Sequence, residues 1–362
     1  MSLVQTVSFT RGVPPQEALE QVKSKLQTYL GRALSGDVSI LQYGHQAGYA
    51  PLRRLLAAEY AVPLDQVMVG NGSLQLLDLL ARMRIHSSRQ AVFTEEPTYD
   101  RALKTFRRNG GRVTAFAIQT DGLDVEALER RLKRIAPAFL YLVPDFQNPT
   151  GITMSLAKRV AVVMLAEKYG FYIIEDVPYR QLRYAGEELP LMRELSPDWV
   201  ITTSSYSKLI APGLRVGYAI GPATLIAELV ALGEQTYLSP TLVTQAAVAA
   251  FIADGRLQDQ VEWLKQLYQP RMAAMLEALA TYIPGAIVTA PEGGFFVSAQ
   301  LPTTANVTHL TKRASSAGLL LTPGRDFFAG AVPTASRFIR LPFCAVSRED
   351  IEQGVQRLAG LL

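Results

Sequence analysis

The sequence predicts an α/β protein with a mostly parallel seven-stranded sheet sandwiched by helices, and a smaller α+β domain. The chain has 362 residues, 49% of them hydrophobic, which suits two packed domains. Between about residues 66 and 221, short apolar runs alternate with amphipathic helical patterns. Strands and helices that alternate in this way form parallel sheets, because each helix carries the chain back to the start of the next strand.

Seven apolar runs are the expected strands of this sheet, and each run is bounded by polar or turn residues. They lie at residues 67–69, 91–93, 113–116, 139–143, 171–174, 200–203 and 216–220. Apolar residues at helical spacing separate most of them, at residues 74–83, 124–135 and 156–169. Ligands of such sheets bind beyond the carboxyl ends of the strands, so residues that follow strands are the first candidates for function.

The segments before and after this region have different patterns. Residues 16–34 carry a helical apolar stripe, and long helices follow at about 240–282, interrupted near Gly255 and Pro270. A mixed region follows, with strands at 295–298 and 338–341 and helices at 308–317 and from residue 348. We expect a large domain at 41–240, a small domain at 241–362, and an N-terminal arm, residues 1–40, that has no strand of its own and joins the small domain.

Composition excludes several functional classes. The formal net charge is +4 and no dense block of lysine and arginine is present, so nucleic-acid binding is not expected. No apolar stretch of about 20 residues is free of charge, and the first residues lack a signal-peptide pattern, so no membrane span is expected. The single cysteine, Cys344, fits a reducing compartment. We expect a cytoplasmic protein that binds no metal.

Residues 204–215 are the most informative segment of the chain. They place Lys208 among serines and apolar residues, with Arg215 seven positions later. A lysine is a nucleophile only as the free amine, which desolvation and nearby cations favour. Such an amine can form a Schiff base with an aldehyde, while Ser205, Ser207 and Arg215 suit a phosphate. The segment therefore indicates pyridoxal phosphate, although an isolated lysine of this kind is more often a surface residue.

Two segments upstream add weaker signals. Residues 70–75 follow a strand and open a helix, so backbone N–H groups and the Ser73 hydroxyl can bind an anion. The same Gly-Ser pair is also an ordinary helix cap. Tyr99 follows the next strand and can stack on a planar ring, or it can be a core tyrosine.

Two further segments are more specific. Asn148 lies in the turn at 144–151, where its amide can donate to a phenolate oxygen, although Asn-Pro also marks plain turns. Asp176 closes a buried strand, where a carboxylate is costly unless it is paired. A protonated pyridine nitrogen would be a suitable partner, and a helix cap or a salt bridge is the alternative. Tyr179 follows closely enough to reach the ring's phenolic oxygen.

Together these segments resemble the fold-type I pyridoxal-phosphate enzymes of the class I/II aminotransferase family. Within it, the chain is similar to the branch of 2-aminoadipate and multi-substrate aminotransferases. The resemblance covers essentially the whole chain and is most specific at residues 146–151, 175–179, 205–208 and 212–215. It implies the fold-type I architecture and pyridoxal 5'-phosphate as the cofactor.

The resemblance also implies a role for each candidate residue. Lys208 is the Schiff-base lysine and proton carrier, and Asp176 pairs with the ring nitrogen. Asn148 and Tyr179 contact the ring hydroxyl, and Tyr99 stacks on the ring. The phosphate is held by five residues, of which Leu74 contributes only its backbone: Ser73, Leu74, Ser205, Ser207 and Arg215.

Three further assignments concern the substrate and a partner subunit. Arg340 matches the arginine that binds the substrate's α-carboxylate, beside Asn148. Tyr43 matches a tyrosine that reaches the neighbouring subunit's phosphate in a homodimer with shared active sites, or it is a turn tyrosine. Arg11 stands where many relatives have glycine, and either binds an acidic substrate side chain or is solvated.

The expected activity is transfer of the amino group of an L-amino acid to a 2-oxo acid, with 2-oxoglutarate as the acceptor that the resemblance implies. A lyase that carries out β-elimination, or another α-carbon reaction, would use the same residues. A cofactor-sensing regulatory domain is a third alternative. The aminotransferase-like pattern begins by about residue 8, and Lys208, Asp176 and Arg340 are all present, which favours catalysis.

Overall fold

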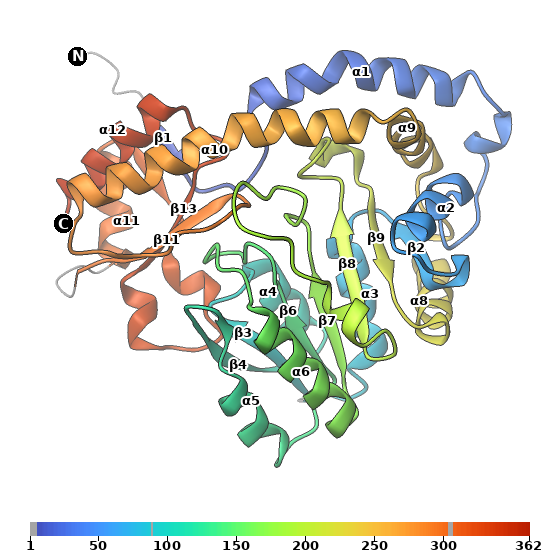
Figure 1. The fold of residues 1–362 in the computed structure, drawn as a ribbon, viewed down its shortest axis with the longest axis horizontal. Coiled ribbons are helices and arrows are strands. Elements are labelled where there is room, and N and C mark those ends of the chain that lie inside the picture. Colours follow the sequence, from blue (N-terminus) through green and yellow to red (C-terminus); the bar gives the residue numbers. More distant parts are fainter. Residues whose placement is uncertain (1–5, 88–89, 303–306) are drawn as a thin grey trace.

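A computed structural model describes residues 6–87, 90–302 and 307–362 (Figure 1). Its centre is an eight-stranded sheet with the order β2-β9-β8-β7-β6-β3-β4-β5. The strands are β2 (Val67–Gly70), β3 (Ala91–Glu96), β4 (Arg112–Gln119), β5 (Gly122–Leu123), β6 (Phe139–Leu142), β7 (Tyr172–Asp176), β8 (Val200–Ser205) and β9 (Gly217–Ile220).

Seven of these strands coincide with the seven predicted ones, and neighbours from β4 through β8 pair in parallel. Strand β9 is antiparallel to both β8 and β2. The two-residue strand β5, antiparallel to β4, was not predicted, because so short a segment carries no apolar alternation. The sheet is therefore mostly parallel, as expected.

Helices cover both faces of this sheet, and adjacent residues of one strand pack on opposite faces. Leu140 belongs to a core with α5 and α6, whereas Tyr141 belongs to a core with α3, α4 and α8. The two sets of helices lie on either side of the strands in Figure 1. Their bounds are α3 (Ser73–Arg84), α4 (Asp100–Arg108), α5 (Val125–Leu132), α6 (Leu156–Tyr169), α7 (Met192–Leu195) and α8 (Ala223–Tyr237).

The rest of the chain forms helices and two small sheets. One sheet has the order β10-β11-β13, and the other pairs β1 with β12 in parallel. These strands are β1 (Val7–Phe9), β10 (Ile287–Val288), β11 (Phe296–Gln300), β12 (Leu319–Leu321) and β13 (Phe338–Pro342). The helices are α1 (Gln16–Leu34), α2 (Ala50–Glu59), α9 (Leu242–Ala253), α10 (Arg256–Tyr282), α11 (Val307–Ser316) and α12 (Arg348–Ala359). Short 3-10 turns include η1 (Val38–Leu41), η3 (Pro212–Leu214) and η4 (Gly324–Phe327).

Two expectations about these segments were wrong. The N-terminal arm does contain a strand, β1, which pairs with the equally unpredicted β12; both have only three residues, and pairing between distant segments is not visible in sequence. Pro270 does not interrupt a helix but lies inside α10. A proline within a helix costs about 3 kcal/mol, and the burial of Leu264, Tyr268 and Leu279 along α10 offsets this cost.

No helix among residues 6–87, 90–302 and 307–362 is long and apolar enough to cross a membrane.

Candidate active site

A cavity of about 630 Å³ lies where the carboxyl ends of the central parallel strands face the region around β11 and β13. Except for Tyr43, every residue that the sequence singled out as a candidate lines it. They are Arg11, Ser73, Leu74, Tyr99, Asn148, Asp176, Tyr179, Ser205, Ser207, Lys208, Arg215 and Arg340. These residues are far apart in the sequence, and the strand ends bring them together as the open-sheet rule predicts.

Lys208 lies just beyond β8, and its side chain is largely enclosed. Its amine donates a hydrogen bond to the Gly12 carbonyl oxygen at 3.1 Å. Burial lowers the pKa of Lys208, and the positive charges of Arg340 and Arg215 lower it further. The neutral amine, which is the nucleophilic form, is therefore favoured.

Asp176, the last residue of β7, faces the cavity with both carboxyl oxygens held. The Thr203 hydroxyl donates to one oxygen and the Tyr141 hydroxyl to the other, each at 3.0 Å. Burial raises the pKa of Asp176 to about 6, and the two hydrogen bonds only partly oppose that effect. A cation beside this carboxyl would lower that pKa and stabilise the ionised form, so the site suits a protonated ring nitrogen.

Another part of the cavity wall is suited to an anion. Helix α3 begins at Ser73, and the first N–H groups of a helix have no partners within it. Arg215 belongs to this part of the wall, with one guanidinium nitrogen 3.2 Å from the Asn71 carbonyl oxygen. Gly72, at φ +98°, makes room for it, since a Cβ there would lie 2.3 Å from the same guanidinium group. Ser205 and Ser207 lie nearby, with hydroxyl oxygens 2.8 Å apart.

Arg340 supplies a second anion-binding position. Its guanidinium group donates to the Asn148 side-chain oxygen at 3.1 Å and to the Thr10 carbonyl oxygen at 2.7 Å. The rings of Phe296 and Phe327 lie 4.8 and 4.6 Å from it. Arg340 is only 7% exposed, and within the described part of the chain its Nε atom has no hydrogen-bond partner. A buried arginine with a spare donor facing a cavity suits a carboxylate ligand.

Two tyrosines complete the wall near Asp176. Burial raises the pKa of Tyr99 to about 12, and it raises the pKa of Tyr179 well above its usual value. Both hydroxyls therefore stay protonated near neutral pH and can donate hydrogen bonds.

The last two candidates, Arg11 and Tyr43, are exposed, unlike the buried residues described above. Arg11 is exposed at the rim of the cavity, and Tyr43, beyond η1, is 75% exposed and lies outside it. Residues that touch the site candidates but were not predicted include Tyr141 and Thr203, which hold Asp176, and Phe296 and Phe327, which lie against Arg340. Tyr141 and Thr203 lie inside strands, and only the register of β6, β7 and β8 brings them beside Asp176.

A buried acid behind the Asn148 turn leads to a prediction on stability. Glu95 is 2% exposed, and its carboxyl accepts hydrogen bonds from the Val143 backbone at 2.9 Å and from the Gln147 amide at 3.3 Å. Burial raises the pKa of Glu95 to about 8 from an ordinary 4.5. The folded protein therefore holds a proton that the unfolded chain releases, and stability falls as pH rises from about 4.5 to about 8.

Replacing Glu95 by glutamine is expected to remove this dependence. The free energy of unfolding is measured by urea titration for the variant and the wild type at pH 5 and at pH 8. The difference, variant minus wild type, should be larger at pH 8 than at pH 5 by on the order of 3 kcal/mol. Glu96→Gln is the matched control, because Glu96 is adjacent but less buried. A parallel pH dependence in Glu95→Gln and the wild type would contradict the prediction.

The sequence is similar to known aminotransferases along nearly its whole length. The family model for aminotransferase class I and II matches residues 4–358. A 2-aminoadipate transaminase of Thermus thermophilus is 33% identical over 98% of this chain and 90% of its own length. Aromatic-amino-acid aminotransferase 1 of Thermococcus litoralis is 32% identical over 99% of this chain and 89% of its own.

A solved structure is similar over the same extent. The α-aminoadipate aminotransferase of Thermus thermophilus, complexed with N-(5'-phosphopyridoxyl)-L-leucine, superposes with a TM-score of 0.92. It is 32% identical, with 98% of this chain and 92% of that chain covered. The likeness thus includes the strands and loops that surround the cavity.

Proposed function

This chain belongs to the class I and II aminotransferase family, and from that premise we propose how its own residues carry out amino-group transfer. The chain is a pyridoxal-phosphate-dependent aminotransferase that acts on amino acids and 2-oxo acids. The observation that carries the residue assignment is that one cavity is lined by Lys208, Asp176, Arg215 and Arg340 together. We propose 2-oxoglutarate as the acceptor.

The residues present fit this cofactor. Pyridoxal phosphate supplies an aldehyde for a lysine and a ring that takes up the electron pair released at the substrate's α-carbon. Asp176 would pair with the ring nitrogen, which would offset the burial of its carboxyl. The phosphate would be bound by Arg215, the hydroxyls of Ser73, Ser205 and Ser207, and backbone N–H groups at Ser73 and Leu74.

The ring oxygen has two donors. The oxygen of the Asn148 amide accepts from Arg340, which leaves its NH₂ group free to donate. Tyr179 stays protonated because burial raises its pKa, so its hydroxyl is the second donor. Tyr99 stacks on the ring. In this proposal the Asn148 side chain thus contacts both Arg340, which binds the substrate carboxylate, and the ring oxygen of the cofactor.

Lys208 moves the proton. Burial lowers the pKa of its amine, which favours the neutral form that accepts the proton from the substrate's α-carbon. With the cofactor bound, the same amine would return the proton on the cofactor's side, and water would supply the oxygen of the 2-oxo acid product. Arg340 binds the α-carboxylate and so orients the carbon–hydrogen bond toward Lys208. We propose that Arg11, which lines the cavity and is exposed, binds an acidic substrate side chain.

The direct test is the half-reaction without an acceptor. Amino acids are added one at a time to the purified protein loaded with pyridoxal phosphate, and the absorbance is recorded. We expect the yellow absorbance to be replaced by that of the pyridoxamine form with at least one donor, and 2-oxoglutarate should restore it. Yellow protein that never responds would contradict transamination, and release of pyruvate and ammonia from cysteine would indicate elimination.

We propose that the enzyme is a homodimer in which Tyr43 of the partner subunit contacts the phosphate. Tyr43 is 75% exposed, and so are its apolar neighbours Val38, at 77%, and Leu41, at 65%. Exposed apolar residues clustered beside a functional tyrosine are typical of a subunit interface.

Mixed dimers test this arrangement. Tyr43→Phe alone should weaken binding of pyridoxal phosphate roughly 10-fold, because a hydrogen bond to an anion is lost. When Tyr43→Phe chains are combined with Lys208→Ala chains, the site with an intact lysine receives an intact tyrosine from its partner. Its affinity should return to the wild-type value. Persistence of the defect in the mixed dimer would mean that Tyr43 serves its own chain or none.

The remaining proposals concern organisation and location. We propose a large domain at residues 41–240, a small domain at 241–362, and an arm at 1–40 that joins the small domain through β1 and β12. We further propose a cytoplasmic location, which is supported by Cys344 being buried as a free thiol.

A further inference from the structure

Behind the wall of the active site lies a cluster of charges centred on Asp145. This residue is 0% exposed, and three arginines surround its carboxylate. Arg159, on α6, approaches at 2.7 Å and is itself 0% exposed; Arg180 approaches at 3.1 Å and Arg183 at 3.7 Å. Among the described residues, Asp145 is the one carboxylate that touches all three, so it counteracts their mutual repulsion.

The cluster connects the two loops that donate to the ring oxygen in the proposed mechanism. Asp145 lies three residues before Asn148, in the turn that follows β6. Arg180 directly follows Tyr179, in the loop that follows β7. The ion pair between Asp145 and Arg180 therefore fixes the position of one donor relative to the other.

Further bonds hold both partners of this pair. Arg159 donates to the Pro144 carbonyl oxygen at 3.1 Å and to the Met154 carbonyl oxygen at 3.0 Å, so it fastens both ends of the Asn148 turn to α6. Arg180 donates to the Leu189 carbonyl oxygen at 2.6 Å and pairs with Glu188 at 2.8 Å. The guanidinium group of Arg183 lies 4.7 Å from the Phe146 ring and pairs with Glu292 at 2.9 Å.

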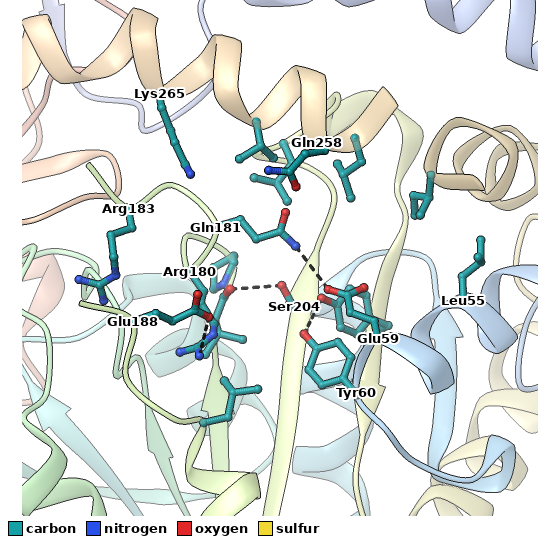
Figure 2. Close-up of a pocket in the computed structure, with 18 of the residues that line it drawn as sticks. Leu55, Glu59, Tyr60, Arg180, Gln181, Arg183, Glu188, Ser204, Gln258 and Lys265 are labelled. Carbon is teal, nitrogen blue, oxygen red and sulfur yellow. Dashed lines mark hydrogen bonds and ion pairs between the residues drawn. The ribbon is translucent and has the colours of Figure 1, made fainter. Parts of the chain in front are cut away.

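The far side of the cluster opens on a second cavity, of about 970 Å³, which Arg180 and Arg183 line (Figure 2). Glu188 lies beside Arg180 in this view and is largely exposed. Asp145 is thus the buried anion of the cluster, whereas Glu188 is a peripheral one. Asp145 and Glu188 both pair with Arg180, but only Asp145 also contacts Arg159 and so joins the Asn148 turn to the Tyr179 loop.

On the basis of the proposed function, we propose that Asp145 is a positioning residue for amino-group transfer. By binding Arg159 and Arg180 together, its carboxylate holds the Asn148 turn and the Tyr179 loop so that both donors reach one ring oxygen. Hydrogen-bond donors to the ring oxygen stabilise its negative charge, and so favour the deprotonated form of the bound cofactor. When these donors are displaced, the pKa of that form rises.

The test is a pH titration of the absorbance of the loaded enzyme, without substrate. In Asp145→Asn the midpoint should rise by about one pH unit, and kcat should fall about 10-fold. Glu188→Gln, the matched control, removes a partner of Arg180 but leaves Asp145 in place, so its midpoint and kcat should equal those of the wild type. A wild-type midpoint in Asp145→Asn would overturn the proposal.

A second variant keeps the test decisive if Asp145→Asn does not fold. Arg180→Lys keeps the charge but loses the forked contact with Asp145 and Leu189, so its midpoint should rise in the same direction by a smaller amount. A wild-type midpoint in folded Arg180→Lys would also overturn the proposal. Since the titration needs no turnover, its result is independent of whether the wild type carries out the half-reaction.

Discussion

The Lys208→Ala variant is expected to lose amino-group transfer almost completely, with kcat lower by about 10⁴-fold. Two lysines line the cavity among the described residues: Lys104 is exposed and pairs with Asp100 at 3.0 Å, whereas burial lowers the pKa of Lys208 so that it can act as nucleophile and base. Alanine can do neither. Steady-state kcat measured with the preferred donor, at saturating cofactor, gives the comparison.

Covalent labelling makes this prediction specific to one residue. Borohydride treatment of the yellow wild-type protein should tag the peptide that contains Lys208, and the variant should yield no tagged peptide. Lys265→Ala is the matched control, since Lys265 lies in the second cavity and pairs with Glu262 at 2.9 Å. Its kcat and its tagged peptide should match those of the wild type. A tag on any other lysine of the wild-type protein would refute the assignment.

The Asp176→Asn variant is expected to bind the cofactor but to lower kcat by about 10³-fold. An ionised carboxyl keeps the ring nitrogen protonated, which lets the ring take up electrons from the substrate carbon, and a neutral amide cannot do this. The hydroxyls of Tyr141 and Thr203 stay in place beside the new side chain, so the loss should fall mainly on kcat.

The preceding residue is a matched control for Asp176. Glu175 is also fully buried in β7, but its carboxyl accepts from the Thr202 hydroxyl at 2.6 Å and from the Met192 backbone at 2.9 Å. Adjacent residues of a strand point to opposite faces, so Glu175 does not line the cavity. Glu175→Gln should change stability while kcat of the folded protein stays near that of the wild type. An equal loss of kcat in both variants would remove Asp176 from its proposed role.

The fold was largely predictable because its signals are local. Each of the seven main strands is an apolar run between polar or turn residues, and β-branched and aromatic residues are common in these runs. The failures had a common cause. Strands β1, β5, β10 and β12 have three residues or fewer, and Pro270 is tolerated within α10 because one face of that helix is buried. Tertiary packing overrode local preference in each of these places.

Most of the polar residues that line the cavity could be picked out from the sequence, but their contacts with one another could not. Asp176 ends a strand, and Asn148 and Lys208 follow strands, which was enough to place all three at one edge of a parallel sheet. The hydrogen bond from Arg340 to Asn148 joins residues 192 positions apart, and no sequence pattern indicates it.

The sequence by itself determined the class of fold, the chemical groups available to a pyridine ring and a phosphate, and the strand ends at which they lie. These follow from local spacing, since the period of a strand and the residue after it are properties of short segments. Only the tertiary structure decided that Tyr141 and Thr203 hold Asp176, and that three arginines surround Asp145. Those contacts depend on strand register and on burial, and burial is also what shifts the pKa values of Lys208 and Asp176.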